Sequence, residues 1–261
     1  MSDRRLGDLT SPPASGRYSR APIVEAVIDL RVSLDRAITL DDLAKVHAQE
    51  SQRYPQVQKR MEVQGEIGLG DTGVRAAAFG TQTGHVLTST DEKHIAQIRL
   101  DGFSFSRLAP YDSWAPFHDE AMRLWTLYRQ IASPEFVTRL GVRYINRLDI
   151  PSQIIEITDY LRTSPEISPA LPQTLAGYFM QIQIPLPDYE AIVNINSTIV
   201  EPPNPNTTAL VLDIGAFREV NLSLSSESFD DDLEEGLTQL RRAKNFVFEG
   251  CITPATREMI I

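Results

Sequence analysis

The sequence predicts an α+β protein with mostly antiparallel sheet and with helices packed on one face of it. Apolar and polar residues alternate with a period of two in several segments, which is typical of half-buried strands. Short turn-forming connections join most of these segments, as in antiparallel hairpins. Longer segments at about 113–132 and 229–249 have helical periodicity instead.

Alternation, capping and proline signals define the elements of the first half. A strand is expected at 22–34, followed by a helix that Thr39 can cap and that Pro55 ends. Helix 113–132 lies between the fourth and fifth strands expected in this half. The further strands are expected at 61–70, 85–91, 94–108 and 135–151.

The first part of the chain contains strand–helix–strand twice, which suggests two pseudo-duplicated β-α-β halves, although no repeat is visible at the level of residues. The second half of the chain follows. Its expected elements are a short helix at 153–162, a proline-rich loop at 163–173, strands at 175–187, 190–200 and 208–220, and the helix at 229–249. The predicted organisation is a flexible arm (1–20), an N-terminal α+β subdomain (21–151), a connecting helix and loop (152–173), and a C-terminal β-β-β-α subdomain (174–261).

Charge and cysteine content exclude several classes of function. A net charge of −10 argues against general nucleic-acid binding, which needs concentrated Lys and Arg. Cys251 is the only cysteine, so an intrachain disulfide and a thiolate metal cluster are both excluded. The chain has no secretion-type apolar segment at its start and no apolar run of about 20 residues. We expect a cytoplasmic protein that does not associate with membranes.

Standard catalytic and cofactor-binding motifs are absent from the sequence. It contains no GxSxG, GxxxxGK[ST], HExxH or strand-to-helix GxGxxG pattern. His118 and Glu120 are two residues apart, which is unsuitable spacing for metal ligands on a helix. Cys251 lies among apolar neighbours and is expected to be a buried hydrophobe. We therefore predict no catalytic residue, no metal and no cofactor, and the sequence leaves open whether the protein is an enzyme.

The aromatic residues of helix 113–132 recur at spacings of three and four. Trp114, Phe117, Trp125 and Tyr128 fall on one stripe, which favours a core helix lying across a sheet. The alternative is an aromatic ligand platform formed by Trp114 and Tyr111. Aromatic content does not separate these two interpretations, because large rings fill cores well.

The strand at 135–151 supplies the candidate site. Alternation places Arg139, Arg143 and Arg147 on the face opposite its apolar residues. These arginines form either an anion- or partner-binding face or one side of an ion-pair network, since the chain contains 35 acidic residues. The other candidate members of the site are Arg107, Tyr111 and Asn146.

Several phrases occur together in an order that resembles a known family. They are APIVEAVIDLRV near the start, FSFSRLAPYDSWAPFHDEAMRLW and LGVRYINRLDIP in the middle, and AKNFVFEGCIT near the end. They resemble an uncharacterised bacterial family of about this length whose members are sporadically distributed. The resemblance implies a bacterial setting and no particular activity.

Two functions are compatible with these observations. The first is a non-catalytic protein that binds or regulates a macromolecular partner. We expect such a protein to be a homodimer, because two-fold oligomers are the commonest kind. The second is a small-molecule or nucleotide-handling protein, an enzyme among the options, that holds an anionic group on its arginine strand.

Overall fold

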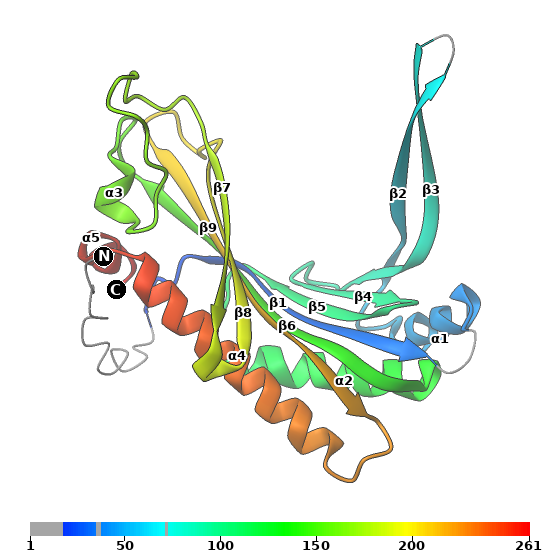
Figure 1. Ribbon diagram of the computed structural model, residues 1–261. Helices are drawn as coiled ribbons and strands as arrows, with labels where there is room; N and C mark the ends of the chain where they lie inside the picture. The colour runs from blue at the N-terminus through cyan, green and yellow to red at the C-terminus, as the bar shows by residue number, and fades with distance from the viewer. Residues whose placement is uncertain (1–17, 35–37, 71–72) are drawn as a thin grey trace. The chain divides into compact units, whose positions relative to one another are not determined.

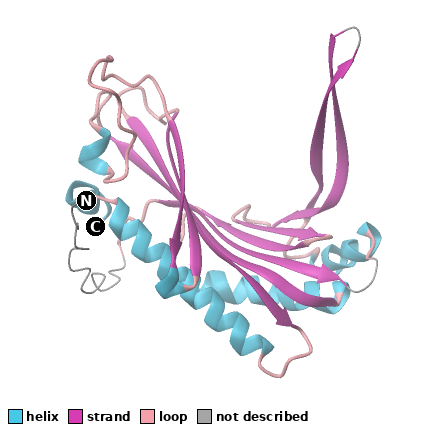
Figure 2. Cartoon of the chain, viewed as in Figure 1, coloured by secondary structure: helices cyan, strands magenta, loops and turns pink. Residues whose placement is uncertain are grey.

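The computed structural model describes residues 18–34, 38–70 and 73–261 of the chain (Figures 1 and 2). Strands and helices alternate in a pattern close to the one predicted. In chain order they are β1 (Ile23–Leu34), α1 (Leu40–Glu50), β2 (Gln56–Gly70), β3 (Gly73–Thr88), β4 (His94–Arg99), β5 (Gly102–Leu108), α2 (Trp114–Ala132), β6 (Pro134–Ile150), α3 (Ile157–Tyr160), β7 (Phe179–Leu186), the 3₁₀ turn η1 (Pro187–Tyr189), β8 (Ala191–Val200), β9 (Thr208–Ser223), α4 (Phe229–Cys251) and α5 (Pro254–Ile260).

The nine strands of the described residues belong to one sheet in the order β2-β3-β4-β5-β1-β6-β9-β8-β7. Strand β1 runs antiparallel to β5, and the hairpin neighbours β2–β3, β3–β4, β4–β5, β7–β8 and β8–β9 are antiparallel as well. The α+β class with an antiparallel sheet is therefore confirmed. The packing of the helices on a single face and the pseudo-duplication stay predictions.

The chain divides into two compact units that are built from interleaved segments. Of the described residues, unit 1 comprises 18–24, 142–218 and 236–261, and unit 2 comprises those within 25–141 and 219–235. Strands β6 and β9 and helix α4 each contribute residues to both units. Each unit has its own set of buried side chains and is described by itself below.

In unit 2 the helix α2 packs its aromatic stripe on β5. Phe103 of β5 lies 6.1 Å, between ring centroids, from both Trp125 and Tyr128. Phe105 is stacked on Phe117 at 5.7 Å. All five rings are buried, so these members of the stripe belong to the core as expected, whereas Trp114 is only half-buried.

In unit 1 the C-terminal part of α4 lies against one face of the sheet. Lys244 of α4 places its Nζ 3.7 Å from the ring centroid of Tyr144 on β6. The buried side chains of β8 and β9, including Val193, Ile195 and Ile214, alternate with more exposed ones. The face of this sheet opposite Tyr144 is therefore the face that α4 does not cover.

The structure corrects three sequence expectations. Residues 94–108 form two strands, β4 and β5, because the chain turns at Leu100 and Asp101. Gly102 follows this turn with φ +153°, where an added Cβ would lie 2.2 Å from the carbonyl oxygen of Leu30. Strands β2 and β3 exceed the lengths expected for them, and a further helix, α5, begins after its N-cap Thr253.

Candidate functional site

Strand β6 carries the three arginines that the sequence singles out. Tyr144 and Leu148 are buried, whereas Arg143 is exposed and Arg147 is half-buried. This alternation is the one predicted. Arg139 belongs to unit 2, whereas Arg143 and Arg147 belong to unit 1, so the three are placed within their own units.

Arg139 is paired with two acids inside unit 2. Its Nη1 lies 3.4 Å from Oδ1 of Asp29 on β1, and its Nε lies 3.5 Å from Oε1 of Glu219 on β9. Neither acid is near Arg139 in the sequence. The contacts place Arg139 in an ion-pair network rather than beside an open anion site.

Arg143 and Arg147 are also paired with acids, inside unit 1. Nε and Nη2 of Arg143 donate to Oδ1 and Oδ2 of Asp213, each at 2.7 Å. Nε of Arg147 donates to Oδ1 of Asp149 at 2.8 Å. Arg143 nevertheless keeps 52% of its side chain exposed, while Asp213 keeps 8%. The guanidinium of Arg143 is thus held rigidly and still faces solvent.

Arg107 does not extend the row of arginines. In the β1–β5 register Arg107 lies opposite Ala26, on the buried face, whereas Asp29 and therefore Arg139 lie on the other face. The guanidinium of Arg107 lies 3.9 Å from Asp91, and its other contact is Asp112 at 3.6 Å.

Tyr111 and Asn146 have structural contacts. The ring of Tyr111 meets Phe117 edge-on at 6.0 Å, and Trp114 meets the same ring at 5.8 Å. Asn146 is 3% exposed, and its Nδ2 donates to the carbonyl oxygen of Leu212 at 3.0 Å. Asn146 is thus buried within unit 1, whereas Tyr111 is a half-buried residue that packs on the Phe117 ring of α2 in unit 2.

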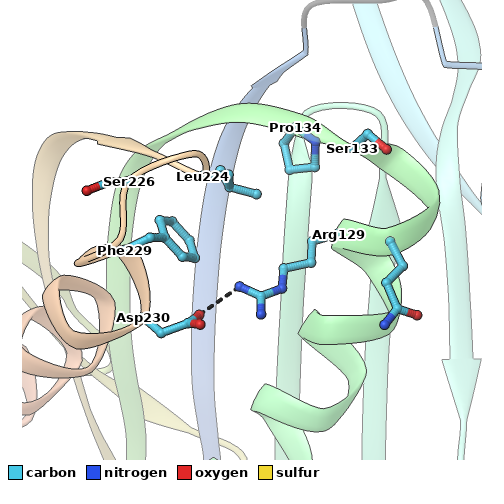
Figure 3. A pocket seen from close by; sticks show the side chains of 8 residues that line it. Arg129, Ser133, Pro134, Leu224, Ser226, Phe229 and Asp230 are labelled. Carbon is cyan, nitrogen blue, oxygen red and sulfur yellow. Dashed lines mark hydrogen bonds and ion pairs between the residues drawn. The ribbon is translucent and has the colours of Figure 1, made fainter.

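A hollow of about 390 Å³ lies in unit 2 where α2 ends and α4 begins (Figure 3). Arg129 and Asp230 face each other across it and form an ion pair at 2.7 Å. Phe229 lies under the same guanidinium, 5.7 Å away. The charged groups that line this hollow neutralise each other, so the hollow has little net charge with which to attract a charged ligand.

A second hollow of about 510 Å³, also in unit 2, is lined by polar groups that bond to one another. Tyr54 donates to Glu120 at 2.7 Å, and burial together with this carboxylate raises the pKa of the Tyr54 hydroxyl. Ser89 donates to Asp91 at 2.5 Å and lowers the pKa of that carboxyl to about 2. His94 lies 3.5 Å from the same carboxylate. Because Ser89 donates to the acid and not to the histidine, this group is not a nucleophile–base pair.

Unit 1 carries a surface that the sequence analysis missed, which we call the amide surface. It consists of Gln181 and Gln183 on β7, Asn194 and Asn196 on β8, and Arg143 on β6. Gln181 pairs with Asn196 and Gln183 with Asn194 in the β7–β8 register, so the four amides form a two-by-two block on one face. Nε2 of Gln183 donates to Oδ1 of Asn194 at 2.9 Å.

Asp213 of β9 is buried beneath the amide surface and connects two of its residues by hydrogen bonds. It accepts hydrogen bonds from Arg143 and, at 2.9 Å, from Nδ2 of Asn196. Among the described residues, Oδ1 of Asn196 is a buried acceptor without a hydrogen-bond partner. The alternation of Gln181 with Gln183, and of Asn194 with Asn196, was the sequence signal for this surface, because amides on a half-buried strand point to one face.

Two titratable groups of unit 1 lie in the core. Burial lowers the pKa of the Lys244 ammonium to about 7, and Arg241 contributes in the same direction. Burial raises the pKa of the Cys251 thiol, which keeps it protonated and unreactive at neutral pH. The expectation that Cys251 is a buried hydrophobe is confirmed, since it is 4% exposed.

The described residues contain no group of three or more His, Cys, Asp or Glu placed to hold a metal ion. In the same part of the chain, no helix is long and apolar enough to cross a membrane. Comparison with protein-family models, with curated proteins and with solved structures finds no match to this chain. The resemblance to a bacterial family therefore stays a prediction.

Proposed function

We propose that this protein is a non-catalytic binding protein that engages a protein partner through the amide surface of unit 1. The observation that carries the proposal is the block of four amides beside a guanidinium that is fixed by Asp213 and half exposed. An amide both donates and accepts hydrogen bonds, so this surface can pair with the mixed polar groups of another protein. Arginine is also enriched at protein interfaces.

The pairing of the arginines favours a protein partner over a small anion. Arg143 and Arg147 each have a carboxylate within 2.8 Å, and Arg139 has two within 3.5 Å. An anionic ligand would have to compete with these carboxylates for the same cations. The two hollows described above, moreover, are lined by residues of unit 2 and include no residue of the amide surface.

Affinity capture from host extract tests this proposal, with mass spectrometry of both proteins and small molecules. The test variant is Asn194→Lys, which places a cation in the amide block without touching Asp213. The control is Gln58→Lys, the same kind of change on an exposed residue of β2 in unit 2. We expect a protein that wild type and control retain and that Asn194→Lys loses. Equal retention by Asn194→Lys, or retention of a small anion alone, overturns the proposal.

The finer architectural predictions are proposed here as well. Segments β1-α1-β3-β4-β5-α2 and β6-α3-β7-β8-β9-α4 share one order of elements. In the sheet, β3-β4-β5-β1 is followed by β6-β9-β8-β7, which is the same sequence of equivalents in reverse. This order supports a duplicated β-α-β-β-β-α fold with β2 as an addition to the first copy. We propose in addition that its helices cover one sheet face.

The biological setting remains as proposed from the sequence. We propose a cytoplasmic protein, which a single, buried cysteine supports. A bacterial origin is proposed on the sequence resemblance alone. A homodimer is part of the same proposal.

A further inference from the structure

Strand β7 is the end strand of the sheet and has one neighbour, β8, among the described strands. Its sequence, FMQIQIPL, carries no charged residue. Edge strands of soluble proteins are normally protected by charges, bulges or covering segments, since their unpaired backbone groups attract other strands. Every residue of β7 is at least partly exposed, so the described residues do not cover it.

The backbone groups that β7 presents outward can be assigned from its contacts. The hydroxyl of Thr198 on β8 donates to the carbonyl oxygen of Tyr178, so the even-numbered backbone groups face β8. Pro185 has no N–H to give, and inside a strand proline is tolerated where its nitrogen faces the outer edge. Both observations place the backbone groups of Phe179, Gln181 and Gln183 on the outer edge.

The side chains of β7 separate into two faces. Gln181 and Gln183 belong to the amide surface, whereas Met180, Ile182 and Ile184 point to the other face and are half-buried. A strand that pairs with β7 has to keep polar residues opposite polar ones and apolar residues opposite apolar ones.

We propose that β7 pairs antiparallel with β7 of a second copy of this chain, with Ile182 opposite Ile182 of the partner subunit. This register sets Gln181 against the partner's Gln183 and Met180 against the partner's Ile184, so both faces match. The outward groups of Gln181 and Gln183 then exchange backbone hydrogen bonds, and Pro185 ends the pairing.

The lack of charge on β7 is compatible with a second copy as its occupant. Two chains of net charge −10 repel each other, and an edge without charged residues is a place where two copies can approach closely. A two-fold pairing also uses the same patch on both subunits, as closed dimers require. The proposal deepens the proposed function, because the amide surfaces of the two subunits become one continuous surface across the new strand pair.

Light scattering after size exclusion measures the mass of the 261-residue protein and of two charge variants. Gln181→Lys/Gln183→Lys adds four cations at the strand pair and is expected to give a monomer. Asn194→Lys, one strand further in, is expected to remain a dimer. A monomeric wild type, or a double variant that stays dimeric, overturns the proposal.

Disulfide trapping tests the register. Ile182→Cys is expected to form a disulfide-linked dimer under mild oxidation, since opposed residues in antiparallel strands have Cβ atoms about 4.5–5.5 Å apart. Met180→Cys serves as the matched control, because its copies lie about 13 Å apart in this register. The native Cys251 is buried and does not compete. Equal trapping at both positions, or trapping of Met180→Cys alone, contradicts the register.

The two proposals can fail separately. A dimer that retains no protein partner leaves the edge pairing intact and removes the proposed function. A monomeric wild type that retains a protein partner, and loses that partner with Asn194→Lys, supports the proposed function and removes the edge pairing. If β7 instead pairs with a strand of a different protein, the wild type is monomeric alone and gains mass only when that protein is added, which overturns the homodimer.

Discussion

The polar sheet faces of the two units differ in the kind of polar group that they carry. In unit 2 the face is closed by ions: Arg99, with 5% of its side chain exposed, lies 2.8 Å from Asp29 and 3.2 Å from Asp101. In unit 1 the face carries neutral amides and the half-exposed Arg143. In unit 2 the buried cation lies beside two acids, although Nη2 of Arg99 has no hydrogen-bond partner among the described residues. In unit 1 the face exposes neutral amide groups and a guanidinium to solvent.

Under the proposed function, this difference separates a surface that stabilises the fold from one that binds a partner. Burying Arg99 is costly, and burial lowers the pKa of its guanidinium while Asp29 offsets part of that effect. Such a cluster tolerates little change. The exposed amides of Gln181 and Gln183 contribute little to stability, and the proposed binding function accounts for their place in the block.

The largest expected effect is on the ion cluster of unit 2. Arg99→Met removes the buried cation, while Asp29 keeps its contacts with Arg31 and Arg139. The loss of the charged contacts of Arg99 should lower the free energy of unfolding by about 3 kcal/mol. Arg31→Met is the matched control, because Arg31 contacts the same two acids, Asp29 and Asp101, but has 40% of its side chain exposed. Its expected loss is below about 1 kcal/mol. Urea unfolding measures both values, and equal losses would remove the distinction between buried and exposed cations.

A second effect concerns the buried Lys244 of unit 1. Its pKa is about 7 in the folded protein and about 10.4 when unfolded, so the unfolded chain binds more protons between these values. The free energy of unfolding should therefore rise with pH, by about 2 kcal/mol from pH 7 to pH 9.

Lys244→Met should abolish this rise and should stabilise the protein at pH 7. Lys59→Met, at an exposed position, should leave the rise unchanged. Urea unfolding at the two pH values supplies the comparison. A wild-type protein whose stability is flat over this range would show that burial does not lower the pKa of Lys244 as described.

A smaller effect is expected at Arg143. Arg143→Lys keeps the charge but replaces a two-pronged contact with Asp213 by a single one, at a cost of about 1 kcal/mol. Arg147→Lys should cost less than about 0.5 kcal/mol, because Asp149 is more exposed than Asp213. The difference in unfolding midpoint between the two variants is the quantity to measure. A larger loss of stability for Arg147→Lys than for Arg143→Lys would show that Arg147, and not Arg143, is the more firmly held arginine.

The sequence predicted the elements well and their pairing poorly. Alternation and proline signals located most strands and the arginine face of β6, and the aromatic stripe of α2 was correctly assigned to the core. The partners of the arginines came from distant strands: Asp29 lies on β1 and Asp213 on β9, and periodicity carries no information on strand order. The turn before Gly102 was missed although its Asp–Gly pair is a strong hairpin signal.

The amide surface was missed for a related reason. Gln181, Gln183, Asn194 and Asn196 look like ordinary solvent-facing positions in either strand alone. They become a block only through the β7–β8 register, which brings Gln181 opposite Asn196. The significance of Arg143 depends in the same way on Asp213, which is buried beneath it.

Photo-crosslinking in the host cell tests the central claim most directly. A photoreactive amino acid is placed at position 194 on the amide surface or at position 58 on the polar face of unit 2, and adducts are identified by mass spectrometry. The account predicts a specific protein adduct at position 194 and none at position 58. An adduct of equal yield at position 58, or its appearance there alone, would contradict the assignment of recognition to unit 1.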